Sequence, residues 1–203
     1  MNKVFPIYRD LLFYNVILVL LICSIFYSCK DKPGRTTVIK PVNLDSIKYS
    51  NPETKPDSIV IISDFRNYQN VYDLINYREL KGNVLYLDIW ATYCGPCLKE
   101  FQISKELKDR YKGKPIKFIY LVDVRDDPRD LTRWDSLIHK YKLYGYHLRM
   151  SNRFYNNINT IPDIKFTGKP HYILIDKEGK IVFPNANRPS SKIRLYEQID
   201  GLL

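Results

Sequence analysis

The sequence contains little glycine and cysteine. Its 203 residues include 8 Gly and 12 Pro, about a tenth of the chain, which excludes collagen-like and low-complexity classes. There is also no block of five like charges and no nucleic-acid motif of the usual spacing. The excess of 32 Lys and Arg over 22 Asp and Glu therefore indicates a solvated basic surface and no nucleic-acid partner. The 45% of hydrophobic and 14% of aromatic residues argue against disorder and suffice for a sizeable core.

The N-terminal segment has the pattern of an export signal. Residues 11–26 carry no formal charge and follow Lys3 and Arg9, as an apolar region follows a positive one in such signals. The stretch is short for a bilayer span, which takes about 17–25 residues. It ends at Ser28 and Cys29, before a polar stretch.

A cysteine at the end of such a region resembles the lipobox of bacterial lipoproteins. The resemblance implies cleavage before Cys29 and lipidation of its thiol, although Phe26 and Tyr27 depart from the usual residues. An uncleaved anchor is the alternative. Both predict an extracytoplasmic protein of the bacterial cell envelope that is held at a membrane by its N-terminus. We expect a signal peptide or anchor over residues 1–28, a linker over 29–57 and a folded domain over 58–203.

Strands and helices alternate in the expected domain. Two nearly continuous apolar runs, Val84–Trp90 and Lys117–Val124, predict central parallel strands that are buried on both faces. The remaining expectations are a strand at Ile59–Ile62, partial helix in 71–80, a helix over 97–111, a helix capped by Asp127, a hairpin of Tyr172–Asp176 with Ile181–Phe183, and a last helix capped by Ser190 or Ser191. The order after residue 84, β-α-β-α-β-β-α, predicts an α/β fold with a mixed sheet and helices on both faces.

Cys94 and Cys97 are the cysteines of the expected domain, at the junction of a strand and a helix. A single pair of cysteines separated by two residues excludes a small scaffold held together by several disulfides. The pair is therefore expected to have a chemical role. Cysteines at i and i+3 in a first helical turn face each other at a distance that a disulfide can bridge. The helix N-terminus favours a thiolate at Cys94, and Pro96 is tolerated there. This geometry suits thiol–disulfide exchange, in which one thiolate attacks and the second thiol resolves the mixed disulfide.

A zinc site is the alternative for this pair. Zinc would need two further Cys or His ligands. The three histidines, His139, His147 and His171, are far apart in the sequence and have no paired spacing, and His139 falls on the polar side of its expected helix. We therefore expect no metal.

Asp88 is an isolated carboxylate in an apolar strand, six positions before Cys94. Buried there, it could take the proton of Cys97 as the mixed disulfide resolves. The alternative is that the strand twists and Asp88 reaches solvent. The sequence leaves both open.

The motif WATYCGPC with Asp88 resembles the thioredoxin superfamily. The segments LKGNVLYLDIWATYCGPCLKE, GYHL, TGKPHYILIDKEGKIV and ANRPSS resemble its membrane-tethered TlpA/ResA-like branch over residues 78–203. This implies a thioredoxin fold with an insertion before the final hairpin and a cis bond between Lys169 and Pro170. It also implies a substrate groove formed by Trp90, Gly95, Pro96, Lys169 and Pro170.

Glu100 matches an acidic residue that the branch often has, which suggests a role in redox tuning; a solvated helix carboxylate is the alternative. Two features depart from the family pattern. The proline that usually kinks the helix after the second cysteine is absent, and Lys169 is unusual before the cis-proline. Its charge is predicted to lower the pKa of a nearby thiol.

The resemblance implies a thiol–disulfide oxidoreductase without an external cofactor. We expect it to reduce protein disulfides, as in cytochrome c maturation, with electrons from a membrane thiol carrier. Cys94 would attack, Cys97 would resolve, and Asp88 would handle the proton. One alternative is a binding module in which the cysteines form a structural disulfide. A thiol peroxidase is a weaker one, because those enzymes use a different cysteine motif.

Overall fold

The computed structural model describes residues 57–203. The expectations for the signal segment, for Cys29 and for the linker up to residue 56 lie outside the described residues. Within residues 57–203, no helix combines the length and the apolar character that a membrane crossing requires.

The described residues form one sheet with helices around it. The strands are β1 (Ile59–Ile62), β2 (Val84–Ala91), β3 (Ile116–Asp123), β4 (Gly145–Arg149), β5 (His171–Ile175) and β6 (Ile181–Phe183). The α-helices are α2 (Val71–Ile75), α3 (Gly95–Phe101), α4 (Ser104–Arg110), α5 (Pro128–Lys140), α6 (Asn152–Ile158) and α7 (Ile193–Asp200). Two short 3-10 helices, η2 (Phe65–Asn67) and η3 (Pro189–Ser191), complete the elements.

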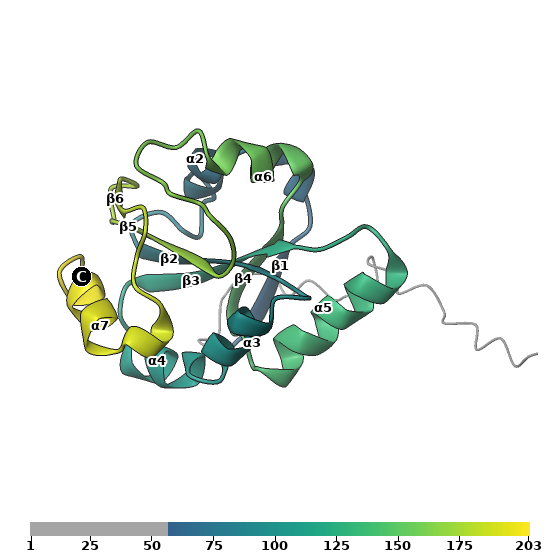
Figure 1. Cartoon of the computed structure of the whole chain (residues 1–203). Helices are drawn as coiled ribbons and strands as arrows, with labels where there is room; N and C mark the ends of the chain where they lie inside the picture. Colours follow the sequence, from purple (N-terminus) through teal and green to yellow (C-terminus); the bar gives the residue numbers. More distant parts are fainter. Residues whose placement is uncertain (1–56) are drawn as a thin grey trace, which may run out of the picture. The chain divides into compact units, whose positions relative to one another are not determined.

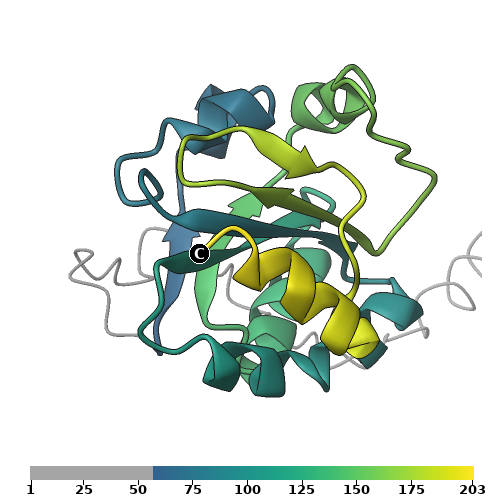
Figure 2. The same cartoon turned by 90° about the vertical axis from the view of Figure 1, so that its left-hand side faces the viewer.

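The sheet is mixed, as predicted. Its strand order is β1-β4-β3-β2-β5-β6, which Figure 2 shows from the side. Strands β1, β4, β3 and β2 are parallel, whereas β5 is antiparallel to β2 and β6 is antiparallel to β5. The C-terminal ends of the four parallel strands therefore share one edge of the sheet, where loops commonly hold a functional site.

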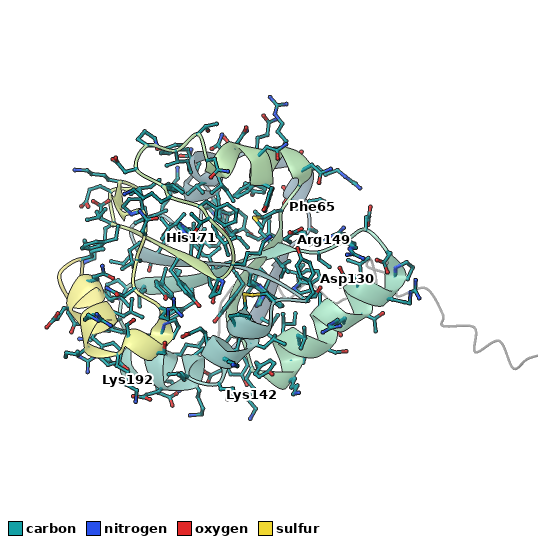
Figure 3. All side chains as sticks on the ribbon, viewed as in Figure 1. Phe65, Asp130, Lys142, Arg149, His171 and Lys192 are labelled. Carbon is teal, nitrogen blue, oxygen red and sulfur yellow. A yellow bond between two sulfur atoms is a disulfide. The ribbon has the colours of Figure 1, made fainter. Side chains whose placement is uncertain are left out.

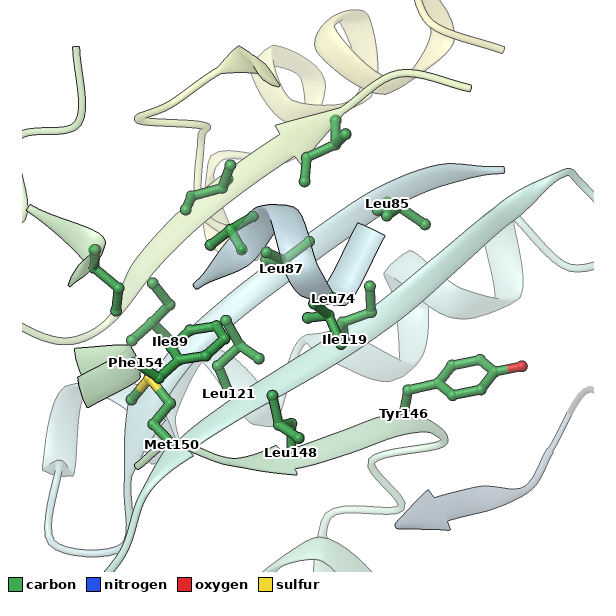
Figure 4. Packing of buried hydrophobic residues seen from close by; sticks show 14 of the residues in the cluster. Leu74, Leu85, Leu87, Ile89, Ile119, Leu121, Tyr146, Leu148, Met150 and Phe154 are labelled. Carbon is green, nitrogen blue, oxygen red and sulfur yellow. The ribbon is translucent and has the colours of Figure 1, made fainter. Parts of the chain in front are cut away.

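Helices cover both faces of the sheet. Helices α2 and α6 lie on one side, and α3, α4, α5 and α7 lie on the other (Figure 1). Side chains of β2 alternate between the two layers, because Leu87 packs with Leu74 and Phe154 of the first layer (Figure 4), whereas Tyr86 packs with Leu195 of the second. All eight residues of β2 are buried, which confirms the predicted central strand.

Three details of the predicted elements are wrong. The helix expected over residues 97–111 is two helices, α3 and α4, with a break at Gln102 and Ile103. The break occurs although the sequence lacks the proline that usually kinks the helix after the second cysteine in the family. The predicted element order also omitted β4 and α6. Finally, Lys192 is the N-cap of α7, because Ser190 lies in η3 and bonds to Glu100 instead.

Strand β4 begins at a glycine for a steric reason. Gly145 has φ +141°, and a Cβ there would lie 2.4 Å from the carbonyl oxygen of Phe118 in β3. Only glycine fits so close to a neighbouring backbone without displacing it. Gly145 thus allows β4 to pair with β3, and the β4–α6 segment forms the expected insertion ahead of the β5–β6 hairpin.

Candidate active site

A disulfide joins Cys94 and Cys97 directly after β2. Cys94 is the N-cap of α3, and its sulfur accepts the backbone N–H of Cys97 at 3.2 Å. The Cα atoms are 5.3 Å apart, and the disulfide is the yellow bond in Figure 3. Cys94 is 8% exposed and Cys97 is 0% exposed. An incoming group therefore reaches Cys94 before Cys97.

The residues around Cys94 differ sharply in exposure. Gly95 and Pro96 are exposed in the first turn of α3, and the preceding Tyr93 is 59% exposed. Trp90, by contrast, is fully buried and packs edge-on against Phe101 at a ring-centroid distance of 4.9 Å. The expectation that Trp90 lines a substrate groove is therefore wrong, because the side chain lies in the core beneath α3.

Asp88 is buried in the middle of β2. It shares the side of the strand that carries Tyr86 and Trp90, which faces the layer of α3, α4, α5 and α7. Its Oδ1 has no hydrogen-bond partner among the described residues. Burial raises the pKa of Asp88 well above 3.8, the nearby Glu100 raises it further, and Lys108 acts in the opposite direction. Of the two alternatives, the structure therefore favours the buried carboxyl over the solvated one.

Pro170 lies beside the cysteine-bearing end of β2. The Lys169–Pro170 bond is cis, as the family resemblance predicted. The next residue, His171, is paired with Ile89 of β2, so the proline is close to the loop that carries Cys94. The structure thus brings this loop and the cis-proline loop to one edge of the sheet.

Asp123 connects these two loops. At the end of β3, its Oδ2 accepts the Lys169 ammonium at 2.7 Å and the Tyr93 hydroxyl at 3.0 Å. The Lys169 ammonium also lies 4.7 Å from the ring centroid of Tyr155. Burial opposes the charge of Lys169, yet the bond to Asp123 raises the pKa of Lys169 overall. Because its charge is paired, an effect of Lys169 on the cysteine thiols stays a prediction.

Glu100 is a buried carboxylate, so the alternative of a solvated helix residue is wrong. Its oxygens accept the backbone N–H of Ser190 at 2.9 Å and the Ser190 hydroxyl at 2.8 Å, and Arg188 approaches to 3.8 Å. Helix α3 is thereby connected to η3. The charge of Glu100 also raises the pKa of Asp88.

Sequence reasoning missed Asp123 and Lys108. The place of Asp123 at the end of a buried parallel strand was an available signal, because such ends meet at one edge. Lys108 gave no signal, since a lysine in a polar helix segment is normally solvated. Among the described residues, no group of three His, Cys, Asp or Glu side chains could hold a metal ion. His139 is exposed, whereas His147 and His171 are buried.

Comparison with known proteins agrees with this geometry. The family described as Redoxin matches residues 63–191. Thiol-disulfide oxidoreductase ResA of Bacillus cereus is 29% identical over 108 residues, which cover 53% of this chain and 57% of that protein. The chain thus spans just over half the length of the curated relatives that it matches first.

Two solved structures from Bacteroides vulgatus, both assigned as thiol-disulfide oxidoreductases, are similar to the chain. The solution structure is 35% identical with a TM-score of 0.50, covering 61% of this chain and 76% of that one. The crystal structure is 31% identical with a TM-score of 0.50, covering 63% and 83%. With the family match across more than half of its length, the chain belongs to the Redoxin family, as a TlpA/ResA-like member of the thioredoxin superfamily.

Proposed function

We propose that the protein is an extracytoplasmic, membrane-tethered thiol–disulfide oxidoreductase that reduces disulfides in other proteins. The observation that carries the proposal is the Cys94–Cys97 disulfide at the start of α3, with Cys94 the more exposed of the two sulfurs. The printed names of the relatives, thiol-disulfide oxidoreductases, support the same class of reaction. The reaction needs no external cofactor, because the cysteine pair itself carries the two electrons.

The reaction has two exchange steps. In the reduced protein, the Cys94 thiolate attacks one sulfur of a substrate disulfide, forms a mixed disulfide and releases the other substrate sulfur as a thiolate. Cys97 then gives its proton to the carboxylate of Asp88 and attacks the sulfur of Cys94. The mixed disulfide breaks, the second substrate thiolate leaves and takes a proton from solvent, and the Cys94–Cys97 disulfide forms. Two electrons have passed from the cysteine pair to the substrate.

The exposed surface next to Cys94 is proposed as the substrate groove. Gly95 and Pro96 border it on one side, and Lys169 and Pro170 border it on the other. A substrate chain that lies extended along the segment before Pro170 would present its disulfide to Cys94. Glu100 is proposed to tune the redox pair, because its carboxylate raises the proton affinity of Asp88.

The membrane attachment rests on the sequence of the N-terminal segment. We propose that the apolar stretch 11–26 directs export and that a lipid on Cys29 holds the domain at the bacterial cell envelope. A membrane thiol carrier would then return electrons to the oxidised pair.

A disulfide-reduction assay tests the activity. The wild-type protein, supplied with a thiol reductant, should reduce the disulfides of a model protein, and Cys94→Ser should abolish the protein-dependent rate. Equal rates for wild type and variant would reject the proposal.

The direction of electron flow needs its own measurement. Thioredoxin, a reductant, has a potential of about −270 mV, and the oxidant DsbA has about −120 mV. We expect a glutathione redox titration of the Cys94–Cys97 pair to give a value toward the thioredoxin end. A value at the oxidising end would reverse the proposed direction while leaving exchange chemistry in place.

A further inference from the structure

A lysine on α4 lies next to the β3 residue that pairs with Asp88. The Lys108 ammonium is 5.1 Å from the ring centroid of Tyr120, and Tyr120 is the β3 residue paired with Asp88 across the sheet. The ammonium donates one hydrogen bond, at 3.2 Å, to the carbonyl of Lys142 (labelled in Figure 3). The Lys108 ammonium therefore lies against the face of the sheet at the position where β3 pairs with Asp88.

Lys108 also lines a cavity of about 520 Å³. Helix α4 contributes to its wall, together with the starts of three parallel strands, represented by Val60, Ile116 and Gly145. The cavity is therefore at the N-terminal ends of these strands, whereas Cys94 follows the C-terminal end of β2. Its volume is large enough for several water molecules. Lys108 is thus in contact with this cavity and in electrostatic reach of Asp88.

The two charges act on each other. Burial lowers the pKa of Lys108 to about 7, and the negative charge of Asp88 opposes this decrease. Burial raises the pKa of Asp88, Glu100 adds to the increase, and Lys108 counteracts it. An opposite charge favours the ionised form of a carboxyl group. Among the described residues, Lys108 is the cation with a clear effect on Asp88.

The other polar groups around the pair do not replace this charge. The groups that face Lys108 or Asp88 are Tyr86 from β2, Tyr120 from β3, His147 from β4, Tyr172 from β5, Glu100 from α3, Tyr144 and the Lys142 carbonyl from the segment before β4, Asp57 ahead of β1, Lys105 and Asp109 on α4, and Lys112 just after it. Burial lowers the pKa of His147 to about 3, so this imidazole is neutral at physiological pH. The lysines Lys105 and Lys112 have carboxylate partners of their own, Asp109 and Asp57.

We propose that Lys108 is a positioning residue for the exchange reaction: from the wall of this cavity, its ammonium favours the ionised form of Asp88, the form that can accept the proton of Cys97. The inference rests on the proposed function. In the step concerned, the proton of the Cys97 thiol moves to the Asp88 carboxylate, and the thiolate attacks the sulfur of Cys94. Asp88 later returns the proton to water.

Three variants of the full-length chain test the proposal. Lys108→Met removes the charge and keeps most of the length, and Lys108→Arg keeps a permanent charge. Lys114→Met is the matched control, because Lys114 is an exposed lysine that lines the same cavity. Carbon-13 NMR of labelled aspartate in the oxidised protein follows the titration of Asp88, with Asp88→Asn to assign the signal. Stopped-flow mixing with a model disulfide follows resolution of the mixed disulfide as a function of pH.

We expect the Asp88 titration and the rate of resolution to change in Lys108→Met and not in the other two variants. In Lys108→Met, the midpoint of the Asp88 titration moves to higher pH, and the rate of resolution at pH 7 falls roughly tenfold. Lys108→Arg and Lys114→Met resemble the wild type in both readouts. In an Asp88→Asn background, Lys108→Met has no further effect on resolution, because the acceptor is already absent.

An unchanged Asp88 midpoint in Lys108→Met, or an equal shift in Lys114→Met, would overturn the proposal. If Lys108→Met does not fold, Lys108→Arg still decides, since a midpoint well above the wild-type value with a permanent cation present contradicts it. If the wild type fails to reduce the model disulfide while the Asp88 midpoint still responds to Lys108, the proposed function fails and the electrostatic coupling stands.

Discussion

At the scale of single residues, Asp88 places an ionisable carboxyl where an apolar side chain would be expected. Its Oδ1 lacks a hydrogen-bond partner among residues 57–203, and burial is the main reason that the pKa of Asp88 lies well above 3.8. A native state that holds a proton which the unfolded chain releases becomes less stable as pH rises from about 4 through the native pKa. The carboxyl therefore reduces stability at neutral and alkaline pH, as expected of a residue that is kept for the proposed reaction and not for stability.

This argument predicts that Asp88→Asn stabilises the oxidised protein at high pH. Asparagine has a similar shape but no charge, so the variant avoids the cost of ionising a buried group. The free energy of unfolding in urea should exceed that of the wild type by about 1–3 kcal/mol at pH 9, and the difference should shrink toward pH 5. A difference that is the same at both pH values would show that ionisation of Asp88 is not the cause.

His147 contributes to the pH dependence with the opposite sign. Burial lowers the pKa of its imidazole to about 3, so its contribution to stability is present above pH 6.5 and is lost as pH falls toward 3. The ring donates its Nε2–H to the Leu143 carbonyl at 2.7 Å and stacks on Tyr120. Because His147 is present in both proteins, its contribution cancels when wild type and Asp88→Asn are compared.

At the scale of elements, Asp123 joins the end of β3 to two loops that border the disulfide. Its Oδ2 binds both Lys169 and Tyr93, so one carboxylate fixes the loop before α3 relative to the loop before β5. An ion pair that is partly shielded from solvent holds its partners better than a fully exposed one. We expect this contact to position the proposed groove for protein substrates.

Asp123→Asn should therefore slow the reduction of a protein disulfide. Expressed as a free energy, this loss of rate should exceed the loss in the free energy of unfolding. The second-order rate constant should fall roughly three- to tenfold, which corresponds to about 1 kcal/mol, while the reduction of a small disulfide changes little. Asp126→Asn is the matched control, because Asp126 lies three residues after Asp123 and also pairs with a cation, Arg149, but is 71% exposed at its side chain. Equal losses in both variants would refute a specific role of Asp123.

The accuracy of the predicted elements depends on how strong the local signal is. Strands β2 and β3 were predicted because both are long apolar runs, and α5 was predicted because Asp127 caps it, accepting the N–H groups of Arg129 and Asp130. Strand β4 was missed because it has five residues and contains His147. Its place depends on pairing with β3, which the local sequence does not encode.

The site follows the same rule. Cys94, Cys97 and Asp88 carry a motif and were identified from the sequence, and the cis bond before Pro170 followed from the family resemblance. The burial of Trp90 agrees with the predicted strand, and only its place in the groove, which came from the family resemblance, was wrong. The burial of Glu100 was not predicted, because it depends on a segment far along the chain. Glu100 is enclosed by Ser190, 90 positions later. The cap of α7 was wrong for the same reason.

At the scale of the whole described domain, the parallel strands separate two regions. Their C-terminal ends hold the disulfide and the Asp123 contacts, and their N-terminal ends hold the cavity that Lys108 lines. Asp88 lies within β2 between these ends. In the proposed reaction, a substrate would approach Cys94 at one end of the strands, while Lys108 would act on Asp88 from the other end.

Alkylation of the reduced protein tests the central claim most directly. After mild reduction, a thiol reagent should modify Cys94 first, with a pH midpoint below about 8.5, the value of a free cysteine, and Cys97 should react only after unfolding. Mass spectrometry of the digested protein identifies the modified residue. A pair that resists mild reductant, or that is modified first at Cys97, would contradict an exchange reaction in which Cys94 attacks.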